Sequence, residues 1–159
     1  MEEFIDNSIE EMAELSNEHF DSIVMDTIYG EVEEMIYDQI ASDSRVIMLT
    51  ATNRVLAQPL ATYLGVEDLI ATNLETVDNK YTGEIVDTYC YGEGKLERML
   101  LWCNENDVDS KDVSYYGDSW SDRFVLEHVK RPHVVNPVKA LRDLAKEKNW
   151  GITDYKIES

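Results

Sequence analysis

One continuous apolar run limits the folds open to this chain more than any other stretch. Residues 45–50 read Arg-Val-Ile-Met-Leu-Thr, with no alternation between apolar and polar positions. A strand of this kind is covered on both faces, as in a parallel sheet with helices on either side. The run therefore predicts a buried strand in an α/β domain.

The residues after this strand are candidates for binding an anion. Thr50 stands at the carboxyl end of the strand, and residues 51–53 turn into a helix predicted over about 54–64. Such a turn places a hydroxyl and free backbone N–H groups at a helix N-terminus, where anions bind readily. The alternative is that Thr50 or Thr52 only caps the helix. The residues alone leave both interpretations open.

A second stretch, residues 115–122, reads Tyr-Tyr-Gly-Asp-Ser-Trp-Ser-Asp. A short buried strand is predicted to end here, and Gly117 opens a turn that carries Asp118 and Asp122. Ligands of parallel α/β sheets bind beyond the carboxyl ends of the strands. If a helix begins near residue 121, both carboxylates can face one Mg²⁺, which takes one or two carboxylates and keeps water or phosphate elsewhere. Ordinary turn and N-cap roles are the alternative.

The remaining pattern alternates helices and strands. We expect an acidic amphipathic helix over 2–20, a helix over 29–41 and a strand over 69–72. Residues 74–86 are a hairpin or a loose excursion that turns at Asp78-Asn79. There follow a helix from Gly92, a helix over 121–130, a strand over 132–135, and a terminal helix over 136–148 that residues 150–152 end. This order implies a three-layer, Rossmann-like α/β domain with a mostly parallel sheet. Lys95 lies in the first turn of its helix, where a cation opposes the helix dipole. A solvated surface lysine is the alternative.

The charge of the chain excludes some classes of partner. Its 159 residues carry 33 acidic and 14 basic side chains, a net charge of −19. Such a field repels nucleic acid and anionic membrane surfaces. A phosphorylated small molecule would need a bound cation or local Lys and Arg to offset it. The acidic first residues do not resemble a signal peptide, and no apolar run reaches the about 18 residues of a membrane span, so we expect a cytoplasmic protein.

Four segments together resemble the haloacid dehalogenase (HAD) superfamily, and within it the phosphoserine-phosphatase-like hydrolases. They are residues 46–52, 92–95, 117–122 and 135–137. The resemblance implies an HAD-type α/β fold and Mg²⁺-dependent hydrolysis of phosphomonoesters through an aspartyl-phosphate. It also implies two parts, with N-terminal helices over 1–44 as a remnant cap or cover and the HAD-like core over 45–159.

The resemblance also assigns roles to individual residues. Thr50 would hold the transferring phosphoryl group, with Ala51 and Ser119 as further phosphate-binding positions. Lys95 would offset negative charge at the nucleophile and the phosphate. The metal ligands would be Asp118, as the principal Mg²⁺ ligand, and Asp122, directly or through water.

One part of the family pattern is absent from the sequence. The first motif, Asp-x-Asp-x-Thr after an apolar strand, supplies the nucleophile and the general acid and base. The only Asp-x-Asp, at 107–109, lies in a polar connection, and a strand-like run that ends at Asp26 has Ile28 in place of the second Asp. The resemblance also implies an incomplete cap. Because the first-motif strand lies in mid-sheet in the family, it predicts a missing central strand. The flanking strands could close the gap, a second chain or a homo-oligomer could fill it, or an N-terminal helix could cover it.

Two functions of different class are compatible with these residues. In the first, the chain is the C-terminal portion of a Mg²⁺-dependent phosphatase whose nucleophile lies elsewhere. In the second, it is a catalytically inactive HAD-like module that binds Mg²⁺, a phosphorylated ligand or a protein partner. As a lone polypeptide, the chain is expected to form no aspartyl-phosphate.

Overall fold

The computed structural model describes residues 2–156, which form two compact units. The first unit ends at Tyr89, and the second spans Cys90–Lys156. This division differs from the expected one, which placed a boundary between residues 44 and 45. Each unit is described by itself below. No helix in residues 2–156 is both long enough and apolar enough to cross a bilayer.

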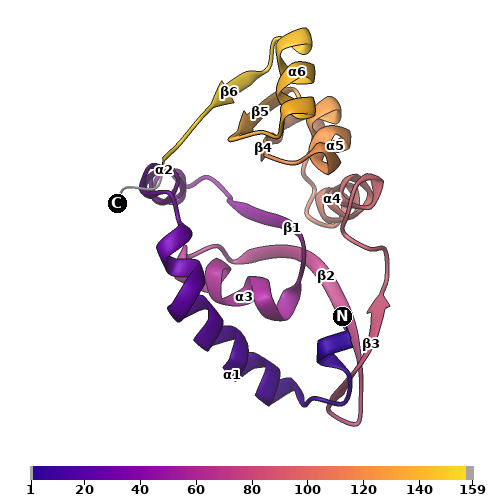
Figure 1. The fold of residues 1–159 in the computed structure, drawn as a ribbon. Helices are drawn as coiled ribbons and strands as arrows, with labels where there is room; N and C mark the ends of the chain where they lie inside the picture. Colours follow the sequence, from indigo (N-terminus) through magenta and orange to yellow (C-terminus); the bar gives the residue numbers. More distant parts are fainter. Residues whose placement is uncertain (1, 157–159) are drawn as a thin grey trace. The chain divides into compact units, whose positions relative to one another are not determined.

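Helices and strands alternate along the chain, as the sequence predicts (Figure 1). The α-helices are α1 (Ile9–His19), α2 (Gly30–Ala41), α3 (Arg54–Tyr63), α4 (Glu93–Glu105), α5 (Arg123–His128) and α6 (Lys139–Lys148). The strands are β1 (Ile47–Asn53), β2 (Asp68–Val77), β3 (Lys80–Val86), β4 (Ser114–Gly117), β5 (Arg131–Val135) and β6 (Gly151–Thr153). Pairing is parallel for β1 with β2, β4 with β5 and β5 with β6, and antiparallel only for β2 with β3 among the described strands. The expected α/β class with mostly parallel pairing is confirmed.

The first unit is built on the sheet β1-β2-β3. The hairpin between β2 and β3 turns at Asp78 and Asn79, whose φ angles are 48° and 64°. Two successive residues with positive φ are typical of the tight turns that match strand twist, and Asp and Asn tolerate this conformation. The expected hairpin is therefore confirmed at the expected turn.

Helix α3 supplies much of the core of the first unit. Its residues Ala57 and Ala61 are buried against Leu69 and Ala71 of β2. Their small side chains let the helix lie close to the strands. The capping residue is Asn53, whose Oδ1 accepts a hydrogen bond of 3.0 Å from the N–H of Leu56. Neither Thr50 nor Thr52, the expected alternatives, caps this helix.

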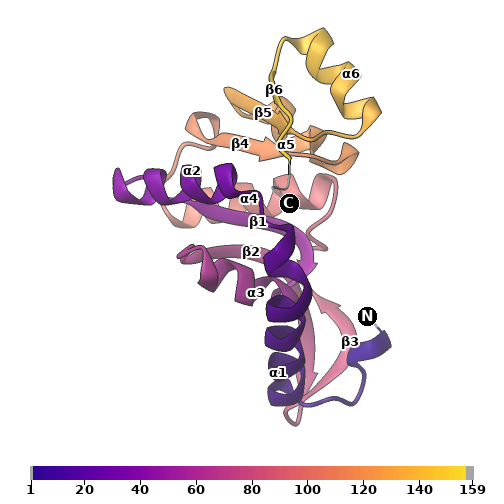
Figure 2. The same ribbon diagram turned by 60° about the vertical axis from the view of Figure 1, so that its left-hand side comes forward.

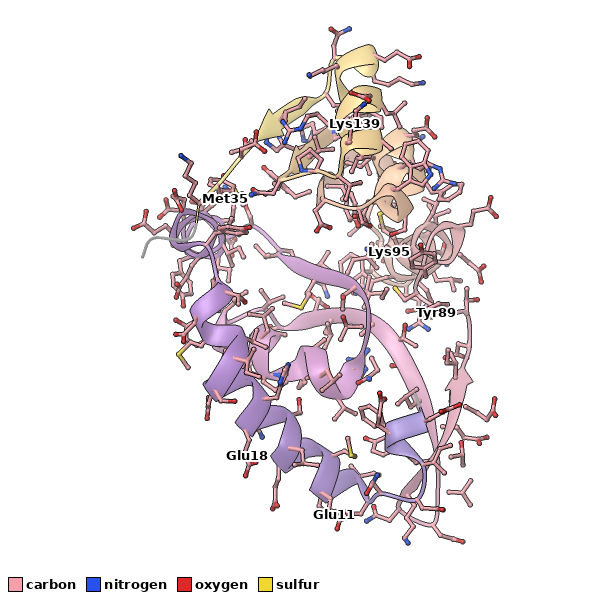
Figure 3. The ribbon with its side chains drawn as sticks, viewed as in Figure 1. Glu11, Glu18, Met35, Tyr89, Lys95 and Lys139 are labelled. Carbon is pink, nitrogen blue, oxygen red and sulfur yellow. The ribbon has the colours of Figure 1, made fainter. Side chains whose placement is uncertain are left out.

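The N-terminal segment of the first unit departs from the expected single helix over 2–20. Residues Glu2–Phe4 form a short 3₁₀ turn that lies beside β3 (Figure 2), and α1 begins only after Ser8, whose side chain caps it. Phe4 is buried edge-on against Tyr81 of β3, so the segment bends to bring this ring into the core. Glu11 and Glu18 of α1 are exposed (Figure 3), as the acidic face predicts, and the carboxylate of Glu11 folds back to accept a hydrogen bond of 3.0 Å from the N–H of Ser8.

The second unit is built on the parallel sheet β4-β5-β6. Tyr116, His133 and Gly151 lie side by side across its three strands. A Cβ at Gly151 would lie 2.2 Å from Nδ1 of His133, so only glycine lets β6 approach this ring. The last helix ends at Lys148, as expected, but the sequence analysis does not predict the strand β6 that residues 151–153 form directly after it. Three residues carry too little periodicity to reveal a strand.

Candidate functional site

The turn after β4 holds the residues that the sequence singles out in the second unit. β4 ends at Gly117, a 3₁₀ turn follows over Trp120–Asp122, and α5 begins at Arg123. The expected helix from residue 121 therefore starts with a tighter turn and ends earlier, at His128. The side chain of Asp122 folds back over this tight turn, and its carboxylate accepts hydrogen bonds from the backbone that leads into it.

Asp122 is the centre of this turn, and only 1% of its surface is exposed. Its Oδ2 accepts hydrogen bonds from the backbone N–H groups of Asp118, at 3.1 Å, and of Ser119, at 3.0 Å. The Ser119 hydroxyl donates to the same oxygen at 3.1 Å. A carboxylate anion held by several N–H and O–H donors is stable even where water is excluded.

Lys95 supplies the countercharge to Asp122. Its Nζ lies 2.5 Å from Oδ1 of Asp122, and both side chains are buried. Lys95 stands in the first turn of α4 (Figure 3), where the helix dipole disfavours a cation, and the carboxylate compensates. The solvated-surface interpretation of Lys95 is therefore wrong. Removal of either partner from such a buried pair is strongly destabilising, because the other charge would stay buried with neither a countercharge nor water.

Tyr115 completes the cluster from β4. Its hydroxyl donates to Oδ1 of Asp122 at 2.9 Å, so the tyrosine and Lys95 share one oxygen. Burial raises the pKa of Tyr115 well above its ordinary value, and the nearby charge of Asp122 adds to the effect. For Asp122 itself, burial raises the pKa, but the charge and hydrogen bonds of Lys95, with those of Ser119 and Tyr115, outweigh it and lower the pKa overall.

Gly117 is needed for close approach rather than for unusual backbone angles. A Cβ at this position would lie 2.8 Å from Cβ and 3.0 Å from Cγ of Asp122. The side chain of Asp122 therefore packs directly over the last residue of β4. Glycine in a strand often marks such a close contact. The sequence pattern predicts only a turn at Gly117 and does not reveal this role.

Asp118 differs from Asp122 in its exposure and in the hydrogen bonds of its carboxylate, and both properties matter for metal binding. It is exposed, and its carboxylate accepts no hydrogen bond from any other residue in the described part of the chain. Its backbone carbonyl, which accepts from Val138 at 3.0 Å, fixes the position of the loop. An available carboxylate on a fixed loop suits Mg²⁺, which binds through one or two carboxylates together with water and phosphate.

The geometry does not favour the prediction that Asp118 and Asp122 bind one Mg²⁺ together. A carboxylate offers about four lone-pair directions. Asp122 already makes five hydrogen-bonding contacts, so it has no capacity left for a cation while the cluster is intact. Within residues 2–156 no group of three or more His, Cys, Asp or Glu side chains could hold a metal. Of the two carboxylates only that of Asp118 is available to an ion, and the metal roles of both residues stay predictions.

Thr50 belongs to the first unit, and it lies inside β1 rather than at its end. The expected turn over 51–53 is wrong, because β1 runs to Asn53 and leads directly into α3, with a register shift between Leu49 and Asn53. The Oγ1 of Thr50 accepts a hydrogen bond of 3.1 Å from the N–H of Thr52, and the carbonyl of Ala51 accepts one of 2.8 Å from the hydroxyl of Thr72. The end of β1 is thus held by neutral hydrogen bonds. That Thr50 and Ala51 converge with Lys95 and Asp118 on one phosphate stays a prediction.

Comparison with known proteins extends these observations. Residues 1–127 match the family of haloacid dehalogenase-like hydrolases. A phosphoserine phosphatase of Mycobacterium tuberculosis is 31% identical over 150 residues, which cover 94% of this chain and 49% of the relative. A histidinol-phosphatase of Neisseria meningitidis is 29% identical over 94% of this chain and 69% of its own. The chain spans about half the length of the mycobacterial relative.

A solved structure matches almost the whole chain. The crystal structure of a Bordetella pertussis Tohama I protein with unknown function superposes with a TM-score of 0.88 and 30% identity, over 93% of this chain and 68% of that one. The family match covers well over half of the present residues, and the mycobacterial and neisserial relatives are phosphatases by name. This chain therefore belongs to the haloacid dehalogenase-like hydrolases and is phosphoserine-phosphatase-like within them.

Proposed function

We propose that these residues form the phosphate-holding and metal-binding portion of a Mg²⁺-dependent phosphomonoester hydrolase. The observation that carries the proposal is the pairing of a buried, fixed cation with an open carboxylate. Lys95 is held at 2.5 Å by Asp122, and the backbone N–H of Asp118 is bound to the same carboxylate. One rigid turn thus fixes the positions of both the ammonium group of Lys95 and the loop residue Asp118, whose carboxylate is available to a metal.

Phosphoryl transfer depends mainly on positioning and on charge stabilisation. Lys95 would offset charge on the phosphoryl oxygens, and Asp118 would hold the Mg²⁺, which neutralises further charge there. Thr50, Ala51 and Ser119 would contribute hydroxyl and backbone donors by resemblance to the family. Asp122 and Tyr115 act through Lys95, since their polar atoms are engaged inside the cluster.

The nucleophile is proposed to come from a segment outside these residues. Asp26 lies in a 3₁₀ turn, Met25–Thr27, and not after a strand. Asp109 binds the N–H of Lys111, two residues along, and Asp107 has a positive φ of 55° in a turn. Neither Asp26 nor the Asp-x-Asp at 107–109 therefore occupies the end of a strand, where the family places its attacking carboxylate.

The edges of the sheets offer a place for such a segment. β1 pairs only with β2, and β4 pairs only with β5, among the strands of residues 2–156. Each sheet thus ends in a parallel strand whose outer N–H and C=O groups can accept another strand. A strand from the same protein or from a second chain, carrying Asp-x-Asp-x-Thr, would satisfy either edge and bring the nucleophile.

The decisive experiment separates binding from turnover. Mg²⁺ and inorganic phosphate are titrated calorimetrically into the parent, Asp118→Asn, and Asp107→Asn as a control for the loss of one exposed negative charge. We expect Asp118→Asn to weaken Mg²⁺ binding by at least about tenfold, while the control matches the parent. Equal affinities in all three proteins would refute the metal assignment.

The alternative function is an inactive module that binds Mg²⁺ or a phosphorylated ligand. The turn positions of Asp26 and Asp107 favour this alternative for the isolated chain. An assay with an aryl phosphate and Mg²⁺ tests the nucleophile first: turnover by the isolated chain that disappears in Asp118→Asn would show that a nucleophile is present. Mg²⁺ binding without turnover is expected of both functions. Turnover that returns when a chain carrying Asp-x-Asp-x-Thr is added favours the hydrolase portion, and its absence favours the module.

A further inference from the structure

One side chain on the candidate loop has no role in holding the loop together. Trp120 lies two residues after Asp118, and 44% of its surface is exposed. Tryptophan is highly buried on average in folded proteins. The turn itself is fixed by Asp122, whose carboxylate binds the backbone on the strand side of Trp120. The exposed indole is therefore presented on a rigid support.

Arg123 occupies one side of this indole. Its guanidinium carbon lies 4.8 Å from the centre of the Trp120 ring and 4.0 Å from the centre of the Phe124 ring. Its Nη1 also donates to the carbonyl of Trp120 at 2.9 Å. The aromatic faces and this carbonyl together hold the cation at the start of α5, in the segment that follows Asp118.

Arg123 also carries no countercharge within the described part of the chain. Several other cations of the second unit pair with carboxylates: Lys95 with Asp122, Lys130 with Asp112, Lys139 with Asp143 and Arg142 with Asp154. Arg123 forms no ion pair with any carboxylate of residues 2–156. In a chain with a net charge of −19, an unneutralised cation in the segment that follows Asp118 attracts an anion that the rest of the surface repels.

We propose that Trp120 and Arg123 form a binding platform for the leaving group of the substrate, and that the substrate is a phosphomonoester with a flat aromatic ring. The inference rests on the proposed function and names its substrate class. The ring would stack on the part of the indole that Arg123 leaves open. The guanidinium would add attraction for the negative phosphate, and Phe124 would keep it in place.

The test uses ligands that cannot be hydrolysed, so it needs no nucleophile. Phenylphosphonate and methylphosphonate are titrated calorimetrically into the full chain with Mg²⁺ present. They share the phosphonate group and differ in the ring. Aromatic stacking predicts that the parent prefers the phenyl ligand by roughly threefold to tenfold. Trp120→Ala should remove this preference, and Trp120→Phe, which retains a flat ring, should keep part of it.

Each outcome decides between the two proposals. Binding of both ligands by the parent with equal affinity, or a phenyl preference that persists in Trp120→Ala, would overturn the platform and leave the phosphate site standing. Binding of neither ligand by the parent would overturn the phosphate site, and the platform with it. Arg123→Gln provides a second measurement, because loss of the cation should weaken both ligands to a similar degree without changing their ratio.

Discussion

The end of β1, residues 50–53, and the turn after β4 look alike in sequence but are held by different forces. Each lies at the carboxyl end of a parallel strand, is rich in Asp, Asn, Ser or Thr, and leads into a helix. The first is held by neutral groups, with Asn53 capping α3 and Thr50 accepting from Thr52. The second is held by the buried charge of Asp122, paired with Lys95.

This difference shows which of the two regions can position a charged group for a reaction. Neutral caps satisfy only the backbone of their own turn. A buried carboxylate requires a cation from elsewhere, and that requirement fixes an ammonium group beside the loop. Charged partners in a dry site interact more strongly than in water, so the second turn is both the costlier to break and the better suited to phosphate chemistry.

The largest expected effect comes from removing the countercharge in the second turn. Lys95→Met keeps most of the side-chain volume but leaves Asp122 charged and buried, and should lower the free energy of unfolding by about 3–5 kcal/mol. Lys139→Met is the matched control. The Lys139 and Asp143 side chains are 90% and 56% exposed, against 10% and 2% for Lys95 and Asp122. The control should cost less than about 0.5 kcal/mol. Urea unfolding followed by circular dichroism measures both, and equal losses would contradict the comparison.

The next largest effect tests the close approach of Asp122 to β4. Gly117→Ala places a methyl group where Cβ of Asp122 lies at 2.8 Å, so the side chain must move away from its donors. We expect a loss of about 1–3 kcal/mol. Gly30→Ala is the control, since nothing lies within 4 Å of a Cβ there. It should be neutral or slightly stabilising, by up to about 1 kcal/mol. A neutral Gly117→Ala would show that the turn can relax.

A smaller effect is expected at the end of β1. Asn53→Ala removes the cap of α3 and should cost about 1 kcal/mol. Thr52→Ala, next to it, should stay within about 0.5 kcal/mol, because the exposed Thr52 takes part through its backbone N–H alone. The same urea experiment measures both variants. A loss in Asn53→Ala as large as that in Lys95→Met would remove the distinction between the two turns.

The smallest effect is a difference in pH dependence. The pKa of Asp122 in the folded protein lies below its ordinary value of 3.8. Its stabilising contribution is therefore complete above that value and is lost as the pH falls through the folded pKa. The amide of Ser119, which binds the carboxylate, should shift in NMR spectra with a midpoint below 3.8. The Leu56 amide, bound to the non-titrating Asn53, should not follow this transition. A Ser119 midpoint above 3.8 would contradict the charge-paired state.

Much of the fold can be predicted because its signals are local. The β2–β3 hairpin follows from Asp78 and Asn79, two residues that accept positive φ, and α3 begins at Arg54, where the sequence predicts it. The strand β6 cannot be found this way, since its three residues become a strand only by pairing with β5. The single helix expected over 2–20 is wrong because Phe4 packs on Tyr81, far away in sequence.

For the same reason, the sequence predicts some features of the candidate site and not others. The sequence points to Lys95, Asp118 and Asp122 through their positions after a glycine turn and a short strand. Their unequal roles, and the part of Tyr115, are not visible there, because Lys95 and Asp122 are 27 positions apart and nothing local marks them as partners. A tyrosine in an apolar strand gives no signal that its hydroxyl binds a carboxylate seven residues later.

By itself, the sequence determined most of the helices and strands, the mostly parallel pairing and the resemblance to a phosphatase-like family, since these depend on residue patterns within short windows. Only the tertiary structure decided that Asp122 is buried with Lys95 and Tyr115, that Asp118 remains open, and that Arg123 lies on Trp120. Burial and charge pairing depend on which distant segments share a water-excluded space. That property belongs to the folded chain and not to any one of its segments.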